Sequence, residues 1–149
     1  MSSVNRATFV QLDVTTLYAL LRLRIDVFVV EQECPYPELD GRDCEPDTRH
    51  LWLADDAGPT AYLRMLVETG GARRIGRVCT RSDARSHGLA ATLMVAALKI
   101  DADATVVLDA QKHLLHWYQR FGFAQSGEPF VEDGIPHVPM RRDPNTVRA

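Results

Sequence analysis

The sequence predicts a mixed α/β fold, in which one sheet combines antiparallel and parallel strands. Two short turns in succession, at residues 55–59 and at Gly70-Gly71, separate three strand-like segments and indicate an antiparallel meander. After residue 81, helical segments alternate with strand-like segments, which is typical of strands joined by helical crossovers. The expected order of elements is β-α-β-β-β-α-β-α-β-β.

A short strand and a capped helix are expected first. Residues 9–12 form the strand. Asp13 and Thr15 or Thr16 can cap the helix that follows, because their side-chain oxygens accept hydrogen bonds from unpaired N–H groups. The helix is expected over residues 17–32. Its core-facing side gathers Leu17, Leu20, Leu21, Arg24 and Phe28.

An acidic loop and the meander come next. Residues 34–48 mix prolines and a glycine with carboxylates, a pattern that predicts an irregular loop. The three strands are expected at residues 50–54, 61–67 and 74–80.

The C-terminal half is expected to alternate helices and strands. A long apolar helix opens at Gly88 and ends near residue 101, and a second helix over residues 113–120 is stopped by Gly122. Between them, residues 105–108 form a continuous apolar run, which predicts a strand covered on both faces. Two final strands are expected to flank the turns at residues 128–129 and 133–136.

The composition is that of a globular protein without a basic surplus. The 149 residues, 46% apolar and 25% charged, suit a single domain spanning residues 1–149. The net charge of −3 argues against a nucleic-acid partner. No apolar run reaches the length of about 18 residues that a membrane span requires, and the polar start lacks a signal core. We therefore expect a cytoplasmic protein with no membrane partner.

The cysteines indicate reduced thiols. Three cysteines, at positions 34, 44 and 79, form no spaced disulfide framework, which again favours the cytoplasm. Cys34, Cys44 and His50 match no zinc-binding spacing, so no metal is expected.

The sharpest local signal is the segment Arg85-Ser86-His87-Gly88-Leu89-Ala90 between a strand and a helix. A helix start carries unpaired N–H groups and a partial positive charge, which suit an anion such as a diphosphate. Gly88 and Ala90 leave space for it, and Arg85 adds charge. An ordinary helix opened by glycine would look the same, so this segment alone leaves both interpretations open.

Two motifs together resemble the GNAT N-acetyltransferase superfamily. Residues 85–90 match its coenzyme A motif, Arg/Gln-x-x-Gly-x-Gly/Ala, and residues 118–123 match its Tyr-x-x-x-Gly-Phe pattern. The asparagine that often precedes this tyrosine is replaced by Gln111, and an alanine by Leu114. The resemblance implies an acyl-CoA N-acyltransferase fold with splayed central strands, and acetyl-coenzyme A (acetyl-CoA) as cosubstrate.

A closer resemblance, over nearly the whole chain, is to the ElaA-type branch of that superfamily. The resemblance implies the branch and its cofactor but names no acceptor. The matching segments are residues 23–32, 34–36, 40–43, 49–51, 75–78, 132–137 and 140–141.

The resemblance also implies where the cofactor lies, in a V-shaped gap between the fourth and fifth strands. The main chain of Val78 and Thr80 would pair with the pantetheine arm as with an added strand, while Cys79 points the other way. A backbone N–H near Thr80 would polarise the acetyl carbonyl, a contact worth about 3 kcal/mol in the transition state. The implied cofactor-binding residues are Val78, Cys79, Thr80, Arg85, Ser86, His87, Gly88, Leu89, Ala90, Ala91 and Gln111.

Tyr118 is the candidate general acid. The expected reaction is direct attack of a neutral amine on the thioester carbonyl, after which the leaving thiolate needs a proton. The motif aims the phenol of Tyr118 at the sulfur in relatives. The alternative is that Tyr118 only packs beside its aromatic neighbours.

The base is not fixed by the sequence, because residues 74–78 of the fourth strand contain no carboxylate. Glu31 and His137 are the candidates we retain, as base or substrate contacts. A water-mediated base, or an amine that arrives neutral, would serve equally well. The wider set of candidates is Glu31, His50, Glu132, Asp133 and His137.

Two charged features need an explanation. Arg24 lies among leucines, so it should have a carboxylate partner or point into the site, because an unpaired buried charge is costly. The acids of residues 38–47 could attract a cationic amine, or they could simply be solvated.

A binding module of the same fold, which holds acyl-CoA without turnover, is the main alternative. The retained Tyr118 argues against it, and the absence of Gly-x-Gly-x-x-Gly and phosphate-loop motifs argues against other nucleotide-binding proteins. The acceptor is expected to be a small-molecule or peptide amine. Whether two copies form a homodimer is left open.

Overall fold

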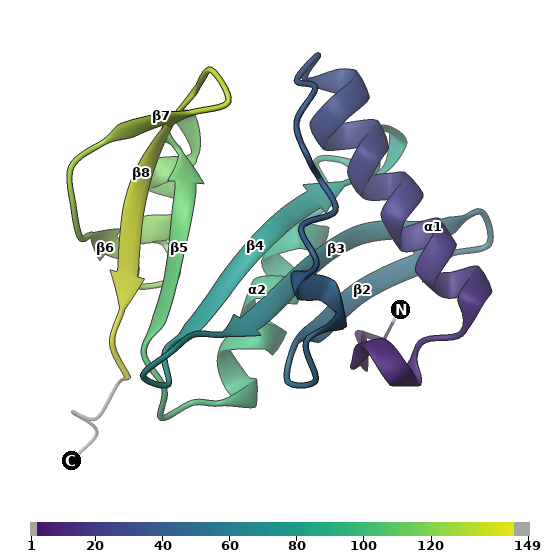
Figure 1. Cartoon of the computed structure of the whole chain (residues 1–149), viewed down its shortest axis with the longest axis horizontal. Coiled ribbons are helices and arrows are strands. Elements are labelled where there is room, and N and C mark those ends of the chain that lie inside the picture. The colour runs from purple at the N-terminus through teal and green to yellow at the C-terminus, as the bar shows by residue number, and fades with distance from the viewer. Residues whose placement is uncertain (1–2, 145–149) are drawn as a thin grey trace.

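The computed structural model describes residues 3–144, which form a mixed sheet with helices on both faces (Figure 1). The strands run in the order β1-β2-β3-β4-β5-β8-β6, and β7 pairs with β8. The strands are β1 (Asn5–Ala7), β2 (Arg49–Asp55), β3 (Gly58–Val67), β4 (Arg73–Thr80), β5 (Val106–Gln111), β6 (Ala124–Gln125), β7 (Phe130–Glu132) and β8 (Ile135–Arg142). The main helices are α1 (Val14–Ile25), α2 (Leu89–Ile100) and α3 (Leu115–Gln119). Short helical turns are η1 (Phe9–Gln11), η2 (Asp26–Glu31), η3 (Arg42–Cys44), η4 (Ser82–Ala84) and η5 (Lys112–Leu114).

The predicted meander is confirmed, because β2, β3 and β4 pair antiparallel in sequence order. The first strand was misplaced. Asn5–Ala7 forms β1, whereas Phe9–Gln11 is a 3-10 turn. The side chain of Gln11 accepts a hydrogen bond from Thr8 N–H at 2.9 Å, and this local bond favours a turn over an extended segment.

Helix α1 begins at Val14, three residues before the predicted start, and it also ends differently. Thr16 N–H donates to the Asp13 carboxylate at 2.6 Å, so Asp13 is the cap. The regular helix stops at residue 25 and continues as the π-helical turn η2, which ends one residue before the predicted boundary. π-Helical turns are rare in proteins as a whole, but those that occur often lie at functional sites. Burial is also shifted along the helix, since the buried residues are Leu20, Leu23, Arg24 and Val27.

The two faces of the sheet have separate apolar clusters. The larger packs β2–β5 and β8 against α2 through Leu93, Met94 and Ala97. The smaller packs α1 against Tyr62 and Cys79. The sheet is therefore a layer between α1 and α2, and both helices fix its central strands.

The central strands β4 and β5 are splayed, as predicted. They run parallel but pair only at their starts, where Arg73 faces Val106 and Arg74 faces Val107. Figure 1 shows the two strands diverging from that point. Beyond Arg74, the edge of β4 that faces β5 has no strand partner within residues 3–144.

Three expectations for the C-terminal half need correction. Strand β5 alternates buried and accessible residues, with Asp109 exposed, because one side faces the gap beside β4 rather than a covering layer. The helix expected over residues 113–120 is α-helical only in α3, since residues 112–114 form a 3-10 turn. Three strands rather than two follow α3, namely the short β6 and β7 and the eight-residue β8. Gly122, at φ +93°, ends α3 as expected.

No helix within residues 3–144 has the length and apolar character needed to cross a membrane.

Candidate active site

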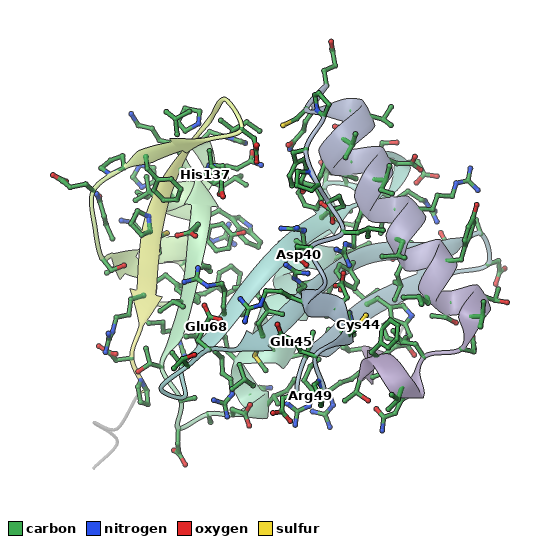
Figure 2. All side chains as sticks on the ribbon, viewed as in Figure 1. Asp40, Cys44, Glu45, Arg49, Glu68 and His137 are labelled. Carbon is green, nitrogen blue, oxygen red and sulfur yellow. The ribbon has the colours of Figure 1, made fainter. Side chains whose placement is uncertain are left out.

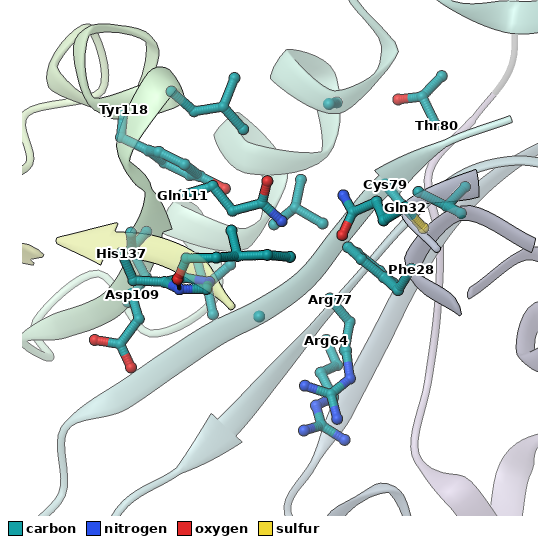
Figure 3. Close-up of a pocket in the computed structure, with 18 of the residues that line it drawn as sticks. Phe28, Gln32, Arg64, Arg77, Cys79, Thr80, Asp109, Gln111, Tyr118 and His137 are labelled. Atoms are coloured by element: carbon teal, nitrogen blue, oxygen red, sulfur yellow. Dashed lines mark hydrogen bonds between the residues drawn. The ribbon is translucent and has the colours of Figure 1, made fainter. Parts of the chain in front are cut away.

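A cleft of about 880 Å³ opens where β4 and β5 diverge (Figure 3). Its walls come from η2, the acidic loop, β4, the start of α2, β5, α3 and the β7–β8 turn. Of the predicted site residues, all but His87 line it. The residues so gathered are Glu31, Val78, Cys79, Thr80, Arg85, Ser86, Gly88, Leu89, Ala90, Ala91, Gln111, Tyr118 and His137.

The start of α2 forms the end of the cleft nearest the C-terminus of β4. Gly88 caps the helix with φ +72°, and no heavy atom lies within 4 Å of where a Cβ would be. No side chain caps the first turn, so its N–H groups are available to an external acceptor. An anionic group fits this open space, because the helix start is partially positive.

Arg85 is already paired with Glu31. Its two terminal nitrogens each donate to a different Glu31 oxygen at 2.6 Å, and its Nε donates to the Thr80 carbonyl at 3.1 Å. The hydrogen bonds from Arg85 lower the pKa of Glu31. The Glu31 carboxylate is therefore kept ionised and paired with Arg85 at the end of the cleft beside the start of α2.

A β-bulge interrupts the pairing of β4 with β3. Between the pair Tyr62–Cys79 and the pair Arg64–Gly76 the register shifts, so residues 77–78 together face a single residue of β3. Bulges of this kind re-aim a strand and are common next to active sites.

The bulge reverses the alternation of the β4 main chain. Arg73 N–H donates toward β5, at 2.8 Å, whereas Arg81 N–H donates toward β3, at 2.7 Å. Without a bulge these two residues, an even number apart, would point the same way. The extra residue is Arg77, at φ +55°. Because of it, the N–H and C=O groups of Val78 and Thr80 face the cleft.

The Cys79 side chain packs under α1 with Leu20, Leu23 and Tyr62. Burial raises the pKa of Cys79 to about 12, so the thiol stays protonated and unreactive at neutral pH. The Cys79 side chain faces the apolar layer under α1. The residue belongs to the cleft wall because the strand that contains it, β4, forms that wall.

Tyr118 lies on α3 with only 7% of its surface exposed. Trp117 and Phe123 pack against its ring at centroid distances of 4.9 and 6.2 Å. No group within residues 3–144 forms a hydrogen bond with its phenol. Figure 3 shows Tyr118 and Gln111 extending into the cleft. Burial raises the pKa of Tyr118, so the phenol is a protonated donor at neutral pH.

His137 lies on β8, next to Gln111 of β5, and lines the cleft wall opposite Asp40 (Figure 2). Its Nδ1 lies 2.7 Å from the Ile135 carbonyl. A carbonyl only accepts, so Nδ1 must carry a proton, and in the neutral ring Nε2 has a free lone pair. The ring stacks on Phe130 at a centroid distance of 5.6 Å, which fixes its plane.

The remaining base candidates separate by position. Glu132 and Asp133 are exposed at the β7–β8 turn and line the cleft. His50 lies outside the cleft, buried against the Tyr62 hydroxyl at 2.6 Å and the Asp43 carbonyl at 3.1 Å. Burial lowers the pKa of His50, which makes it a neutral structural residue.

The acidic loop is not a freely solvated segment, and most of its carboxylates are already paired rather than available to attract a cationic amine. Arg24 has the carboxylate partners that its burial requires, since it pairs with Glu38 at 2.7 Å and with Asp43 at 2.8 Å. Arg64 of β3 pairs with Asp40 and Asp43 at 2.5 and 3.1 Å. The loop is therefore held against the sheet by buried ion pairs. Four of its five acids, Glu38, Asp40, Asp43 and Glu45, are paired with arginines, and Asp47 is exposed.

Several cleft residues were missed from the sequence. Arg64 and Arg77 lie side by side at the floor of the cleft (Figure 3), and Asp109 of β5 lines the same cleft. A charge inside an apolar strand run, as at Arg64 and Asp109, is the signal that could have found two of them. Arg77 lies in the matching segment 75–78, but nothing in the sequence indicates its role, because that role comes from the bulge.

Within residues 3–144, no three His, Cys, Asp or Glu side chains are grouped as metal ligands. Cys34 instead donates to the Asp133 carbonyl at 3.4 Å, and Cys44 is exposed.

The comparisons with known proteins agree with this geometry. A family model described as an acetyltransferase (GNAT) domain matches residues 25–144. A UPF0039 protein of Mycobacterium tuberculosis is 48% identical over 144 residues, covering 94% of this chain and 92% of the relative. Protein ElaA of Escherichia coli is 42% identical over 141 residues, covering 89% and 91%.

Solved structures show the same fold. The crystal structure of an acyl-CoA N-acyltransferase from Pseudomonas aeruginosa matches with a TM-score of 0.90 and 44% identity, covering 95% of this chain and 99% of that one. The crystal structure of Escherichia coli ElaA matches with a TM-score of 0.90 and 38% identity, covering 96% and 100%.

Proposed function

This chain belongs to the GNAT acetyltransferase family, and from this premise we propose that it transfers an acetyl group from acetyl-CoA to the amine of an acceptor. The observation that carries the proposal is one continuous cleft, which joins the open start of α2, the unpaired edge of β4 and the phenol of Tyr118. A diphosphate, an extended pantetheine arm and a thioester need these three features in this order.

The cofactor would be held by main-chain groups at both ends of its arm. The first-turn N–H groups of α2, opened by Gly88, suit the diphosphate, and residues 85–91 form the wall around it. The pantetheine amides would pair with Val78 and Thr80 along the free edge of β4. Gln111 would contact the arm from β5, whereas Cys79, whose side chain packs under α1, would support β4 beside the arm.

Arg85 would contribute charge to the diphosphate only in competition with Glu31, which now holds it. We therefore place Glu31 at the cofactor end as the partner of Arg85 rather than as the base. His137 fits the base better, because its Nε2 lone pair is free and its ring is held in place by Ile135 and Phe130.

In the proposed reaction the amine nitrogen forms a bond to the thioester carbonyl carbon, and the carbon–sulfur bond breaks. His137 takes the proton that the amine nitrogen loses. A main-chain N–H of β4 stabilises the charge that develops on the carbonyl oxygen. Tyr118 donates a hydrogen bond to the sulfur, which leaves as the thiolate of coenzyme A, and His137 passes the amine proton on to solvent.

The test is binding and turnover measured on the same preparation. Calorimetry should detect free coenzyme A and acetyl-CoA binding at one site, and acetyl-CoA with a panel of amines should release thiol steadily. The panel covers polyamines, amino acids, aminoglycosides and peptide N-termini. Absence of binding by folded protein would overturn the proposal, and binding without turnover across the panel would favour a binding module.

A further inference from the structure

Arg77 adopts a backbone conformation that its residue type disfavours. Its φ of +55° is in the left-handed region, where side chains with a Cβ are uncommon. The position is the first residue of the β4 bulge, which in the common bulge of this geometry is glycine. Something outside the strand must therefore hold Arg77 in place.

The acidic loop supplies that hold. The Nε of Arg77 donates to a Glu38 carboxylate oxygen at 2.9 Å, and its Nη2 donates to the Glu38 carbonyl at 2.8 Å. The guanidinium lies over the Tyr36 ring, 5.6 Å from its centroid. Glu38 itself is 4% exposed and fixed by Arg24 at 2.7 Å. The Arg77 side chain is thus clamped to a part of the loop that cannot easily move.

We propose that Arg77 is a positioning residue, whose clamp by Glu38 and Tyr36 maintains the bulge that turns the amides of Val78 and Thr80 into the cleft. The inference rests on the proposed function, because its consequence is alignment of an N–H with the thioester carbonyl. The acidic loop then serves catalysis through the backbone of β4 rather than by binding the acceptor.

Substitution at residue 77 separates the backbone effect from the side-chain effect. Glycine adopts a positive φ without strain, so Arg77→Gly should keep the bulge without the clamp. Alanine has the strain of a Cβ and no clamp, so Arg77→Ala should let the strand relax and misaim the amides. Neither change leaves Glu38 unpaired, since Arg24 still holds it.

The experiment measures thiol release per coenzyme A-binding site, with the number of sites taken from calorimetry. We expect Arg77→Gly to stay within about threefold of the unmodified protein in kcat. We expect Arg77→Ala to lose at least about tenfold, because a misaimed donor forfeits much of its effect. Affinity for free coenzyme A should change little in Arg77→Gly. In Arg77→Ala it should fall less than kcat, since residues 85–91 still hold the diphosphate and only the pairing of the pantetheine arm with β4 is disturbed.

The control pair is Arg73→Gly and Arg73→Ala, on the same strand outside the cleft, where φ is not positive. At residue 73 the glycine variant should not have a higher kcat than the alanine variant, because glycine weakens an ordinary strand. Equal loss in both Arg77 variants would show that the guanidinium acts directly. Full activity of Arg77→Ala would show that the bulge needs no clamp. Either result overturns the inference.

A second measurement covers the case in which Arg77→Ala does not fold. Tyr36→Leu should lower kcat in the unmodified protein but not in the Arg77→Gly background, where there is no clamp to lose. Additive effects would contradict the inference. Failure of the unmodified protein to bind coenzyme A would instead overturn the proposed function, so the two failures are distinguishable.

Discussion

Tyr118 shows how burial determines what a single side chain can do. Apolar neighbours raise its pKa above the usual value of about 10 for a tyrosine. The phenol is therefore a reliable donor at any physiological pH, but complete proton transfer to a thiolate, whose conjugate acid has a pKa of about 8.5, is uphill. Hydrogen bonding to the developing negative charge on sulfur is the larger part of its proposed role.

Tyr118→Phe should lower kcat by about tenfold or more while leaving coenzyme A affinity nearly unchanged, because the lost contact exists mainly in the transition state. Steady-state thiol release and calorimetry check the two parts. Tyr18→Phe, at an exposed tyrosine of α1, is the matched control and should behave like the unmodified protein. An undiminished rate in Tyr118→Phe would leave the ring with only a packing role.

His137→Ala should lower kcat/KM for the amine by about tenfold to a hundredfold at neutral pH, because the Nε2 atom proposed to accept the amine proton is then absent. The deficit should shrink as the pH rises and more of the acceptor is already neutral. A pH series of kcat/KM measures it, with His116→Ala, an exposed histidine on α3, as control. A deficit that is the same at every pH would argue that His137 does not act as a base.

At the scale of elements, the sequence predicted best where local chemistry determines the structure. The Asp13 cap, the turn at Gly70-Gly71 and the opening of α2 at Gly88 each follow from one residue type and its backbone preference. The first strand was misplaced because residues 9–11 form a turn, in which the Gln11 side chain accepts a hydrogen bond from Thr8 N–H. The bulge at Arg77 could not be predicted, since it depends on contacts with a loop far away in the sequence.

Gly88→Glu should weaken coenzyme A binding by at least about tenfold, since it adds bulk, a negative charge and strain at φ +72° where the diphosphate would lie. Calorimetry measures the affinity. Gly70→Glu is the matched control, because it also has a positive φ and open space but lies in the β3–β4 turn outside the cleft. Equal affinity in folded Gly88→Glu would place the diphosphate elsewhere.

At the scale of the whole molecule, the cleft exists because two halves of the sheet meet at few places. Strands β4 and β5 pair only at their starts, and across the cleft the Cys34 thiol contacts the Asp133 carbonyl. The half that contains β1–β4 is tied to α1 by Arg24, which joins the helix to the acidic loop. Because these contacts hold β4 in place from the α1 side, β4 and β5 can remain apart and the gap between them stays open.

The same ion pairs make the stability of the fold depend on pH. Burial alone would raise the pKa of Asp40 and of Asp43, but hydrogen bonds from Arg64 and Arg24 outweigh it, and both pKa values are lowered. A carboxyl group with a lowered pKa in the folded state stabilises the fold above its unfolded pKa, which is about 3.9 for Asp. That contribution is lost as the pH falls further. Stability should therefore be nearly flat from pH 7 to about pH 5 and decline below it.

Asp40→Asn should remove part of this decline. Arg64 keeps Asp43 as a partner, so no buried charge is orphaned, and the loss at pH 7 should be about 1–2 kcal/mol, because Asp40 is partly exposed to solvent. The slope of unfolding free energy below pH 4 should fall by at most about 1.4 kcal/mol per pH unit, the value for one proton. Urea unfolding between pH 7 and pH 2.5 measures both quantities. Asp56→Asn, in the exposed β2–β3 turn, is the control. If the unfolding free energy of Asp40→Asn falls with pH as steeply as that of the control, the acid sensitivity does not come from the pairing of Asp40 with Arg64.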